Sequence, residues 1–167
     1  LAAILAILMA SNILTLNQYL YQFVRFGGAG SWDDAMFALS NKVPSIQADE
    51  IFAADWGIFN SLTTLNGGQL PLQDDAFAFT VDNPPEFSQR LALESFARKN
   101  SIWVTRTTGN EMFPGANARL EKMASADGYR KIELGQVLDR NHRPVFEIFR
   151  IVPSPAPWLP LGSTLHP

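Results

Sequence analysis

Residues 50–65 read EIFAADWGIFNSLTTL, and this stretch decides the fold. Its first part, residues 50–55, is short and mostly apolar, which is typical of a strand buried on both faces. The dipeptide Trp56-Gly57 then turns the chain into a predicted helix over residues 58–65, which the glycines at 67 and 68 end. A buried strand that passes directly into a helix predicts a sheet of parallel strands with helical crossovers.

The same alternation continues toward the C-terminus. Further apolar or periodic stretches predict, in chain order, a strand at 76–81, a helix at 87–99, a strand at 101–105 and a helix at 116–126. Residues 131–138 and 144–152 are β-like runs that a short polar connection joins into a hairpin. We therefore expect an α/β fold, a three-layer sandwich with a mainly parallel sheet and an antiparallel C-terminal hairpin at one edge.

A helix is also expected before the first strand. Ser31 can cap it, and Asp33 and Asp34 would lie in its first turn, where carboxylates interact favourably with the helix dipole. Pro44 ends this helix, whereas five prolines near the C-terminus predict an extended tail. The chain thus divides into an N-terminal membrane-like helix, an α/β domain and a proline-rich tail, which we place at residues 1–28, 29–152 and 153–167.

The N-terminal helix carries no charged residue before Arg25. Residues 1–10 are apolar without a break, and beyond them polar residues recur at helical spacing: Ser11, Thr15, Gln18 and Gln22. We interpret this segment as the end of a membrane span that leaves the bilayer near Ser11 and continues as a juxtamembrane helix. The alternative is a helix buried in a soluble protein.

Two expectations follow from the membrane interpretation. The first three turns should project from the domain, so burial of Ile4, Leu5 and Leu8 within the chain would contradict it. The scarcity of Lys and Arg at the C-terminal end of the helix favours the extracytoplasmic side of the membrane.

Composition excludes several classes of protein. The chain has 167 residues, of which 47% are apolar and 17% charged, so one domain with a buried core is expected. A net charge of −3 predicts no basic face for a nucleic-acid partner. The absence of cysteine excludes disulfides, iron–sulfur clusters and thiol catalysis, and two histidines leave little for a zinc site or a histidine-based triad.

Two loops offer candidate ligand contacts, because ligands of open α/β sheets bind beyond the carboxyl ends of the strands. Residues 55–60 follow the first strand and residues 105–110 follow the third. The candidate substrate-binding residues are Asp55, Trp56, Asn60, Arg106 and Thr107, a set that suits a sugar or a phosphate. The structural alternative is that Asp55 caps the following helix and Trp56 belongs to the core.

No cofactor is predicted. The glycines of residues 27–30 (GGAG) resemble half of a dinucleotide fingerprint, but they follow a helix instead of a strand. The adjacent carboxylates at 33–34 and 74–75 are expected to be solvated and not metal ligands. The sequence has no phosphate-binding loop, no G-x-S-x-G and no H-E-x-x-H, and we assign no catalytic residue.

Two short motifs carry a resemblance to a known family. Residues 31–35 (SWDDA) and 51–57 (IFAADWG), after a membrane-like helix end, resemble the C-terminal region of bacterial family-39-type membrane glycosyltransferases, the protein mannosyltransferase and aminoarabinose transferase relatives. The resemblance spans about residues 1–152. It implies a small extracytoplasmic α/β domain after a many-helix membrane domain, in an enzyme that transfers a sugar from a polyprenyl-phosphate donor. The family's catalytic acid lies in an extracytoplasmic loop of the membrane domain, so no catalytic residue is carried over to this chain.

Two functions are consistent with these observations. The first is an accessory domain of a membrane glycosyltransferase on the periplasmic side of the bacterial inner membrane, which positions the acceptor. Its partners would be the membrane, the rest of the membrane-embedded domain and a sugar or lipid-linked sugar. The second is a non-catalytic, flavodoxin-like module that binds a ligand or a protein. An independent hydrolase is disfavoured, because no nucleophile has an evident base.

Overall fold

The computed structural model describes residues 2–27 and 33–155. Five strands form one sheet in the order β2-β1-β3-β5-β4. The first three strands are parallel: β1 (Glu50–Ala53), β2 (Leu72–Asp74) and β3 (Ser101–Arg106). Strand β5 (Pro144–Pro153) runs antiparallel to β3 and pairs with β4 (Tyr129–Leu138) at the edge. The expected mainly parallel sheet with an antiparallel hairpin at one edge is confirmed.

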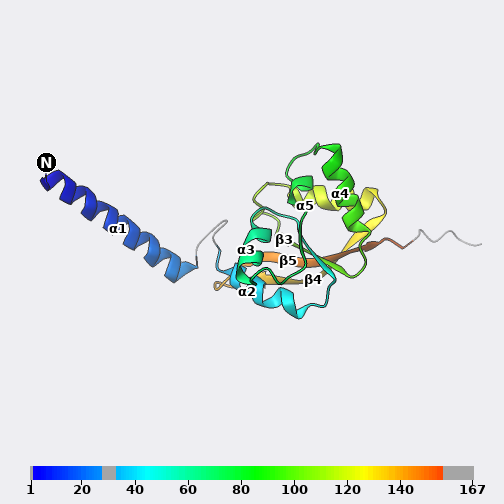
Figure 1. Ribbon diagram of the computed structural model, residues 1–167, viewed down its shortest axis with the longest axis horizontal. Helices are drawn as coiled ribbons and strands as arrows, with labels where there is room; N and C mark the ends of the chain where they lie inside the picture. The colour runs from blue at the N-terminus through cyan, green and yellow to red at the C-terminus, as the bar shows by residue number, and fades with distance from the viewer. Residues whose placement is uncertain (1, 28–32, 156–167) are drawn as a thin grey trace, which may run out of the picture.

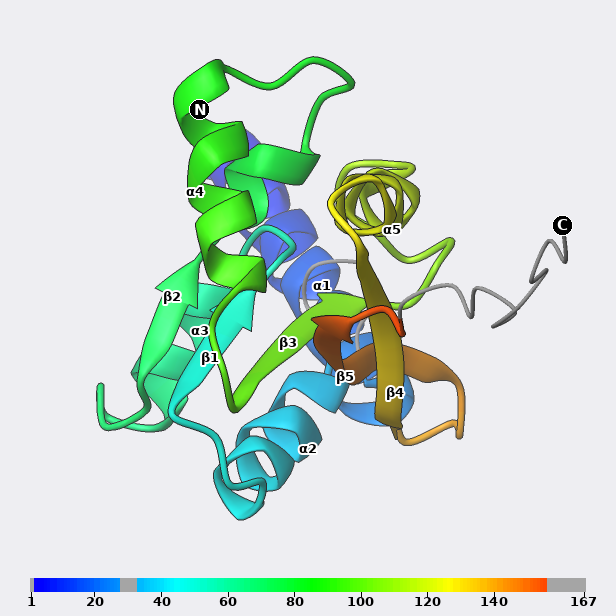
Figure 2. The same ribbon diagram turned by 90° about the vertical axis from the view of Figure 1, so that its right-hand side faces the viewer.

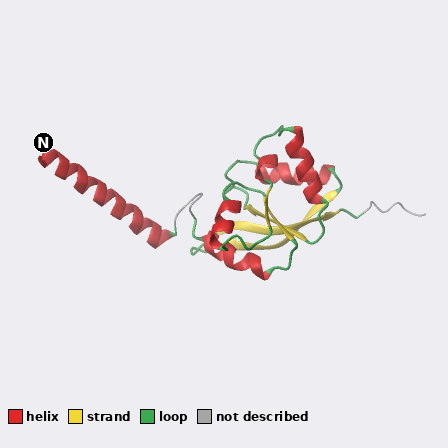
Figure 3. Cartoon of the chain, viewed as in Figure 1, coloured by secondary structure: helices red, strands yellow, loops and turns green. Residues whose placement is uncertain are grey.

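Helices cover both faces of this sheet (Figure 3). On one face, α2 (Ala35–Lys42) and α3 (Ile58–Leu65) bury Leu39 and Leu62 against apolar strand residues such as Val104. On the other face, α4 (Glu86–Phe96) and α5 (Ala116–Ala126) bury Phe96 and Leu120 against Phe52, Trp103 and Phe149. These two cores on opposite faces make the three-layer sandwich that the sequence predicts.

The predicted strand at 76–81 is wrong. Residues Ala76–Phe79 form a 3₁₀-helix, η3, and the second strand is the preceding Leu72–Asp74. The backbone N–H of Asp75 donates to the Ala53 carbonyl, after which the chain turns away from the sheet. The apolar run packs Phe79 into the α4–α5 core, while Phe77 is 71% exposed. The buried apolar residues of the 76–79 segment therefore pack against helices. The edge strand β2, in contrast, is mostly polar because it is only partly buried.

The expected helix near residue 31 begins later than predicted. Asp33 and Asp34 both precede α2, and the Asp33 carboxylate accepts a hydrogen bond from the backbone N–H of Ala35. The proposed cap Ser31 lies outside the described residues. Pro44 lies in a short 3₁₀-turn, η2 (Val43–Ser45), that closes the helix as expected. Helix α4 also ends earlier than predicted, at Phe96 instead of Lys99.

The N-terminal segment is one helix, α1 (Ala2–Phe26), and none of its residues is buried (Figure 1). Ile4, Leu5 and Leu8 are 62%, 54% and 58% exposed, so the expected projection from the domain is confirmed. The helix is long and apolar enough to cross a membrane. At about 1.5 Å per residue it spans roughly 37 Å, more than the ~30 Å hydrocarbon thickness of a bilayer.

The hairpin turn between β4 and β5 holds the C-terminal end of α1. The Arg140 guanidinium donates to the Val24 carbonyl and to the Asp34 carboxylate, and the Asn141 amide donates to the Phe26 carbonyl at 3.1 Å. These bonds satisfy carbonyls that a helix end leaves without intrahelical partners. Gly27 follows with a φ of +83°, and a Cβ there would lie 2.7 Å from the Asp34 carboxylate. The predicted proline-rich tail falls outside the described residues from residue 156 onward.

Candidate functional site

A buried ion pair joins the carboxyl ends of the two central parallel strands. Strands β1 and β3 are in register at Ala53 and Val104, so Asp55, just after β1, lies beside Arg106, the last residue of β3. The Asp55 Oδ2 and Arg106 Nε atoms are 3.9 Å apart, and each residue is 2% exposed. The guanidinium also lies over the ring of Phe146, 5.0 Å from its centroid.

Asp55 holds a loop and does not cap a helix. Its Oδ1 accepts the Trp56 N–H at 2.7 Å, and its Oδ2 accepts the Met112 N–H at 3.1 Å. The N-cap of α3 is Gly57, whose φ of +82° needs glycine. The structural alternative for Asp55 is therefore wrong, and its carboxylate ties the loop after β3 to the end of β1.

Burial and electrostatic attraction shift the pKa values of this pair in opposite directions. Burial raises the pKa of Asp55, and the two backbone hydrogen bonds and Arg106 offset part of that rise. Burial likewise lowers the pKa of Arg106, against the attraction of Asp55 and Asp33. The guanidinium is thus stabilised by carboxylates on two separate segments of the chain.

A cavity of about 380 Å³ lies against this pair. Its lining consists of Asp33, Arg106, Gly109, Asn110, Glu111, Met112 and Val145. Burial raises the pKa of Asp33, and the neighbouring charges of Asp139 and Asp34 add to that rise. The Asn110 amide donates to the Thr107 hydroxyl at 2.7 Å and to the Pro144 carbonyl at 3.1 Å. The cavity combines one cation with carboxylates and an amide, groups that can bind hydroxyls.

The five predicted site residues do not all converge. Asp55 and Arg106 meet, and Thr107 lies next to them, where its hydroxyl donates to the Pro144 carbonyl at 2.9 Å and so anchors the loop. Trp56 is 53% exposed and is neither a core residue nor part of the cavity lining. Asn60 lines a different, apolar hollow between α1, α2 and α3. The structure therefore brings three of the five together, Asp55, Arg106 and Thr107, and of these Arg106 lines the cavity.

Sequence reasoning missed two carboxylates in the lining. Asp33 was expected in the first turn of a helix, but it lies before α2 and reaches the cavity. Glu111 directly follows the predicted loop 105–110, and its Oε1 accepts the Asn117 N–H at 3.0 Å. Both residues could have been considered as candidates, because each is a carboxylate beside a segment that was already assigned to the end of a strand or helix. No local pattern shows that the two segments approach each other.

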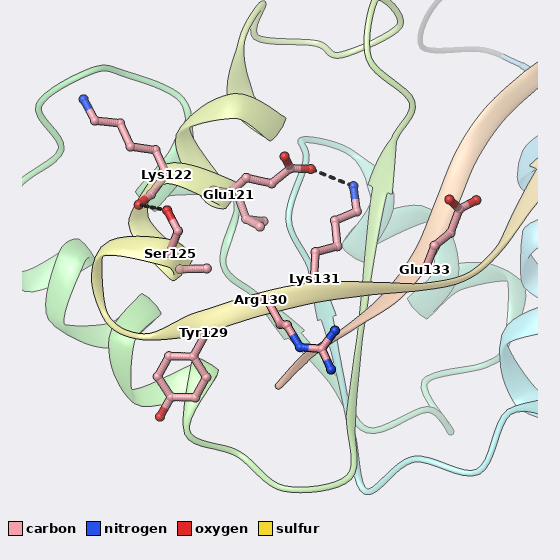
Figure 4. A pocket seen from close by; sticks show the side chains of 9 residues that line it. Glu121, Lys122, Ser125, Tyr129, Arg130, Lys131 and Glu133 are labelled. Carbon is pink, nitrogen blue, oxygen red and sulfur yellow. Dashed lines mark hydrogen bonds and ion pairs between the residues drawn. The ribbon is translucent and has the colours of Figure 1, made fainter. Parts of the chain in front are cut away.

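A second polar cluster lies on the opposite face of the sheet, beneath α5. Lys131 Nζ donates to Glu147 at 2.7 Å. It also donates to Glu121 at 3.0 Å and borders an open hollow of about 610 Å³ between α5 and β4 (Figure 4). The Asn117 amide also contacts Glu147, at 3.3 Å, and accepts the Thr105 hydroxyl at 2.8 Å. We call this set the α5–β4 cluster.

The contacts of this cluster indicate a structural role. Burial raises the pKa of Glu147, and Lys131 offsets part of that rise. Burial lowers the pKa of Lys131, but hydrogen bonds and charges of Glu147 and Glu121 raise it above its ordinary value. The lysine already has two carboxylate partners, so the cluster mainly fastens β4 to α5.

No group of three metal-ligating side chains occurs among residues 2–27 and 33–155. Comparisons with known protein families, with curated proteins and with solved structures find no match to this chain.

Proposed function

We propose that this chain is an extracytoplasmic accessory domain of a polytopic membrane glycosyltransferase that uses a polyprenyl-phosphate sugar donor. One observation carries the proposal: a fully exposed, membrane-length helix ends at the same edge of the sheet as the polar cavity beside Arg106. The motifs at 31–35 and 51–57 support the choice of enzyme, since they resemble that family. The cavity would hold part of the acceptor at the membrane surface.

The charges of the cavity favour a hydroxyl-rich, uncharged ligand over a phosphate. Among the described residues at the cavity, Arg106 faces the carboxylates of Asp33, Asp55 and Glu111. The nearby Arg143 already pairs with Asp139 at 2.6 Å. An excess of carboxylates repels a phosphate, whereas carboxylates and a guanidinium both form strong hydrogen bonds with sugar hydroxyls.

In this proposal the domain positions a substrate and does not itself catalyse transfer. A catalytic base must reach the hydroxyl whose proton it removes. Both carboxylate oxygens of Asp55 accept backbone N–H groups instead, and the side chain is buried. The full chain with a lipid-linked donor and candidate acceptors should therefore show no turnover. Turnover that Asp55→Asn abolishes would contradict the accessory role.

Binding by the chain in detergent micelles tests the ligand class. Neutral monosaccharides and inorganic phosphate would be titrated by ligand-observed NMR against the parent chain and two variants, Asp33→Asn and Glu111→Gln. Both amides keep an acceptor for the backbone bonds and remove one negative charge. We expect sugar affinity to fall about tenfold in each variant, in line with a lost charge-assisted hydrogen bond of about 1–3 kcal/mol.

For phosphate, the two substitutions should have the opposite effect on affinity. If the cavity binds phosphate, the same substitutions remove repulsion and should raise affinity, which would contradict the proposed ligand class. Lys122→Ala, in the hollow beside α5, is the matched control and should change neither titration.

A further inference from the structure

Exposed aromatic side chains gather at the carboxyl end of the parallel strands. Trp56 follows β1, Phe77 follows β2 and Phe113 lies in the loop that follows β3, with exposed fractions of 53%, 71% and 37%. Phe37, in the first turn of α2, is 59% exposed. We call these four residues the aromatic edge. Exposed aromatic groups at one edge are typical of a surface that contacts another apolar phase.

Helix α1 ends at this same edge. The Arg140 and Asn141 side chains hold its last carbonyls, and the turn that carries them lies at the end of β5 that pairs with the last residue of β3. Figure 1 shows α1 extending away from this end of the sheet, and in Figure 2 it lies behind the strands. The C-terminal end of α1 is therefore held at the same end of the sheet as the aromatic edge.

Apolar surface continues from α1 to the aromatic edge. A hollow of about 380 Å³ lies between the last turns of α1 and the helices α2 and α3. Phe23 lines it from α1, Phe37 from α2 and Leu65 from α3. Polar side chains also line the hollow, namely Asp33, Asn60, Ser61 and Thr64. Its exposed surface is nevertheless mainly apolar and joins the end of α1 to Phe37.

We infer that the aromatic edge rests in the headgroup region of the bilayer that α1 enters. A helix that crosses the membrane brings its attached edge to the interface, where aromatic rings are favoured because one end is apolar and the other tolerates water. The charged groups at this edge have both signs and pair with one another, as Arg140 does with Asp34 and Arg143 with Asp139. This mixture favours neutral headgroups over anionic ones.

This placement sharpens the proposed function, on whose membrane anchor it rests. The cavity beside Arg106 shares the edge with Trp56 and Phe113, because the Met112 N–H is bound to Asp55. A ligand would then reach the cavity from the membrane surface. Among hydroxyl-rich ligands, those linked to a lipid are then expected to bind more tightly than the free sugars.

Single-cysteine spin labelling tests the inference directly, because the chain has no native cysteine. Phe77→Cys and Phe113→Cys would be labelled with a nitroxide in the full chain, reconstituted in phosphatidylcholine vesicles. Leu8→Cys reports on the anchor, and Lys99→Cys, at the opposite end of the sheet, reports on water. For each label we compare two collision rates of the nitroxide: with oxygen, which concentrates in lipid, and with a nickel chelate, which stays in water.

We expect the labels at 8, 77 and 113 to favour oxygen severalfold more than the label at 99. A label at 8 in lipid with 77 and 113 in water overturns the inference and leaves the anchor intact. A label at 8 in water overturns the membrane anchor itself. Labels at 77 and 113 that are shielded from both reagents would reveal a protein partner, which also overturns the lipid assignment.

Native fluorescence gives a second measurement without a label. The emission of Trp56 is the difference between the parent chain and Trp56→Phe, a substitution at an exposed position that keeps an aromatic ring. Brominated phosphatidylcholine should quench this difference, and aqueous iodide should not. Quenching by iodide alone would contradict contact with the bilayer.

Discussion

The ion pair of Asp55 and Arg106 and the α5–β4 cluster are built on neighbouring residues of β3, yet they differ in how deeply their charges are buried. Arg106 and Thr105 are consecutive in β3 and point to opposite faces of the sheet. Around Thr105, Lys131 and Glu147 are 2.7 Å apart in a closed hydrogen-bond network. At the strand ends, Arg106 Nε and Asp55 Oδ2 are 3.9 Å apart beside a cavity. These side chains are 2% and 0% exposed, against 21% and 10% for Lys131 and Glu147.

The difference separates a structural network from a candidate binding site. Closed networks of buried polar groups rigidify a fold, because each donor and acceptor has a partner. A buried ion pair that borders a cavity also presents its charges to a ligand at short range. Substitutions at the two places should therefore affect stability to different degrees.

Arg106→Ala should have the largest effect on stability. It leaves the carboxylate of Asp55 buried without the guanidinium, and we expect a loss of about 3–5 kcal/mol in the free energy of unfolding. Arg98→Ala, which breaks an exposed pair with Glu50, is the control and should cost no more than about 0.5 kcal/mol. Urea unfolding in detergent followed by tryptophan fluorescence measures both. Equal losses in the two variants would contradict the buried pair.

Lys131→Met should cost less, about 2 kcal/mol, because Lys131 is partly exposed and its neighbours retain other contacts. Glu147 keeps the amide of Asn117 in this variant. Lys122→Met, an exposed change in the same hollow, is the matched control and should be nearly neutral. A loss in Lys131→Met that exceeds the loss in Arg106→Ala would reverse our ranking of the two regions.

Gly27→Ala should loosen the junction between α1 and the domain, at a cost of about 1–2 kcal/mol from the positive φ. The added Cβ would also meet the Asp34 carboxylate, which must then move away from Arg140. Gly67→Ala is the control, since it has a positive φ but nothing within 4 Å. Hydrogen exchange at residues 24–27 should increase only in the Gly27 variant, and an equal increase in both would show a general loss of stability instead of a loosened junction.

The smallest effect concerns pH. Burial raises the pKa of Glu147 above its ordinary 4.5, so the folded chain holds this proton more tightly than the unfolded chain does. The stabilisation is fully present below about pH 4.5 and is lost as pH rises through the higher pKa of the folded state. Glu147→Gln should remove this decline from the pH dependence of the unfolding free energy. An unchanged slope in the variant would contradict the assignment.

Asp55→Asn sharpens the comparison between the two regions. The pKa of Asp55 is also raised by burial, so the same sign applies, with the decline beginning near its ordinary value of 3.8. If each substitution removes a different part of the pH dependence of the unfolding free energy, Asp55 and Glu147 titrate independently. A shared response would indicate coupling through β3.

Local pattern was sufficient for most of the fold. Strands were predicted at 50–55 and 101–105 and a helix at 58–65, because apolar runs, periodicity and glycine stops act over a few residues. The structure has them at Glu50–Ala53, Ser101–Arg106 and Ile58–Leu65. Local pattern failed where burial depends on distant neighbours. Within the run at 76–81, Ala78 and Phe79 pack against α4 and α5, whereas Phe77 is exposed. Leu72–Asp74 is mostly polar because it lies at the sheet edge.

The candidate site divides in the same way. Sequence alone was sufficient to place Asp55 near Arg106, since adjacent parallel strands end at one edge whatever their loops do. The exposed position of Trp56 and the approach of Asp33 and Glu111 to the cavity depend on the tertiary structure. The path of each loop is set by contacts with distant segments, such as the bond from Met112 to Asp55 and the hold of Arg140 on α1. Periodicity reports which face of an element is buried, but only the packed chain decides which loops meet.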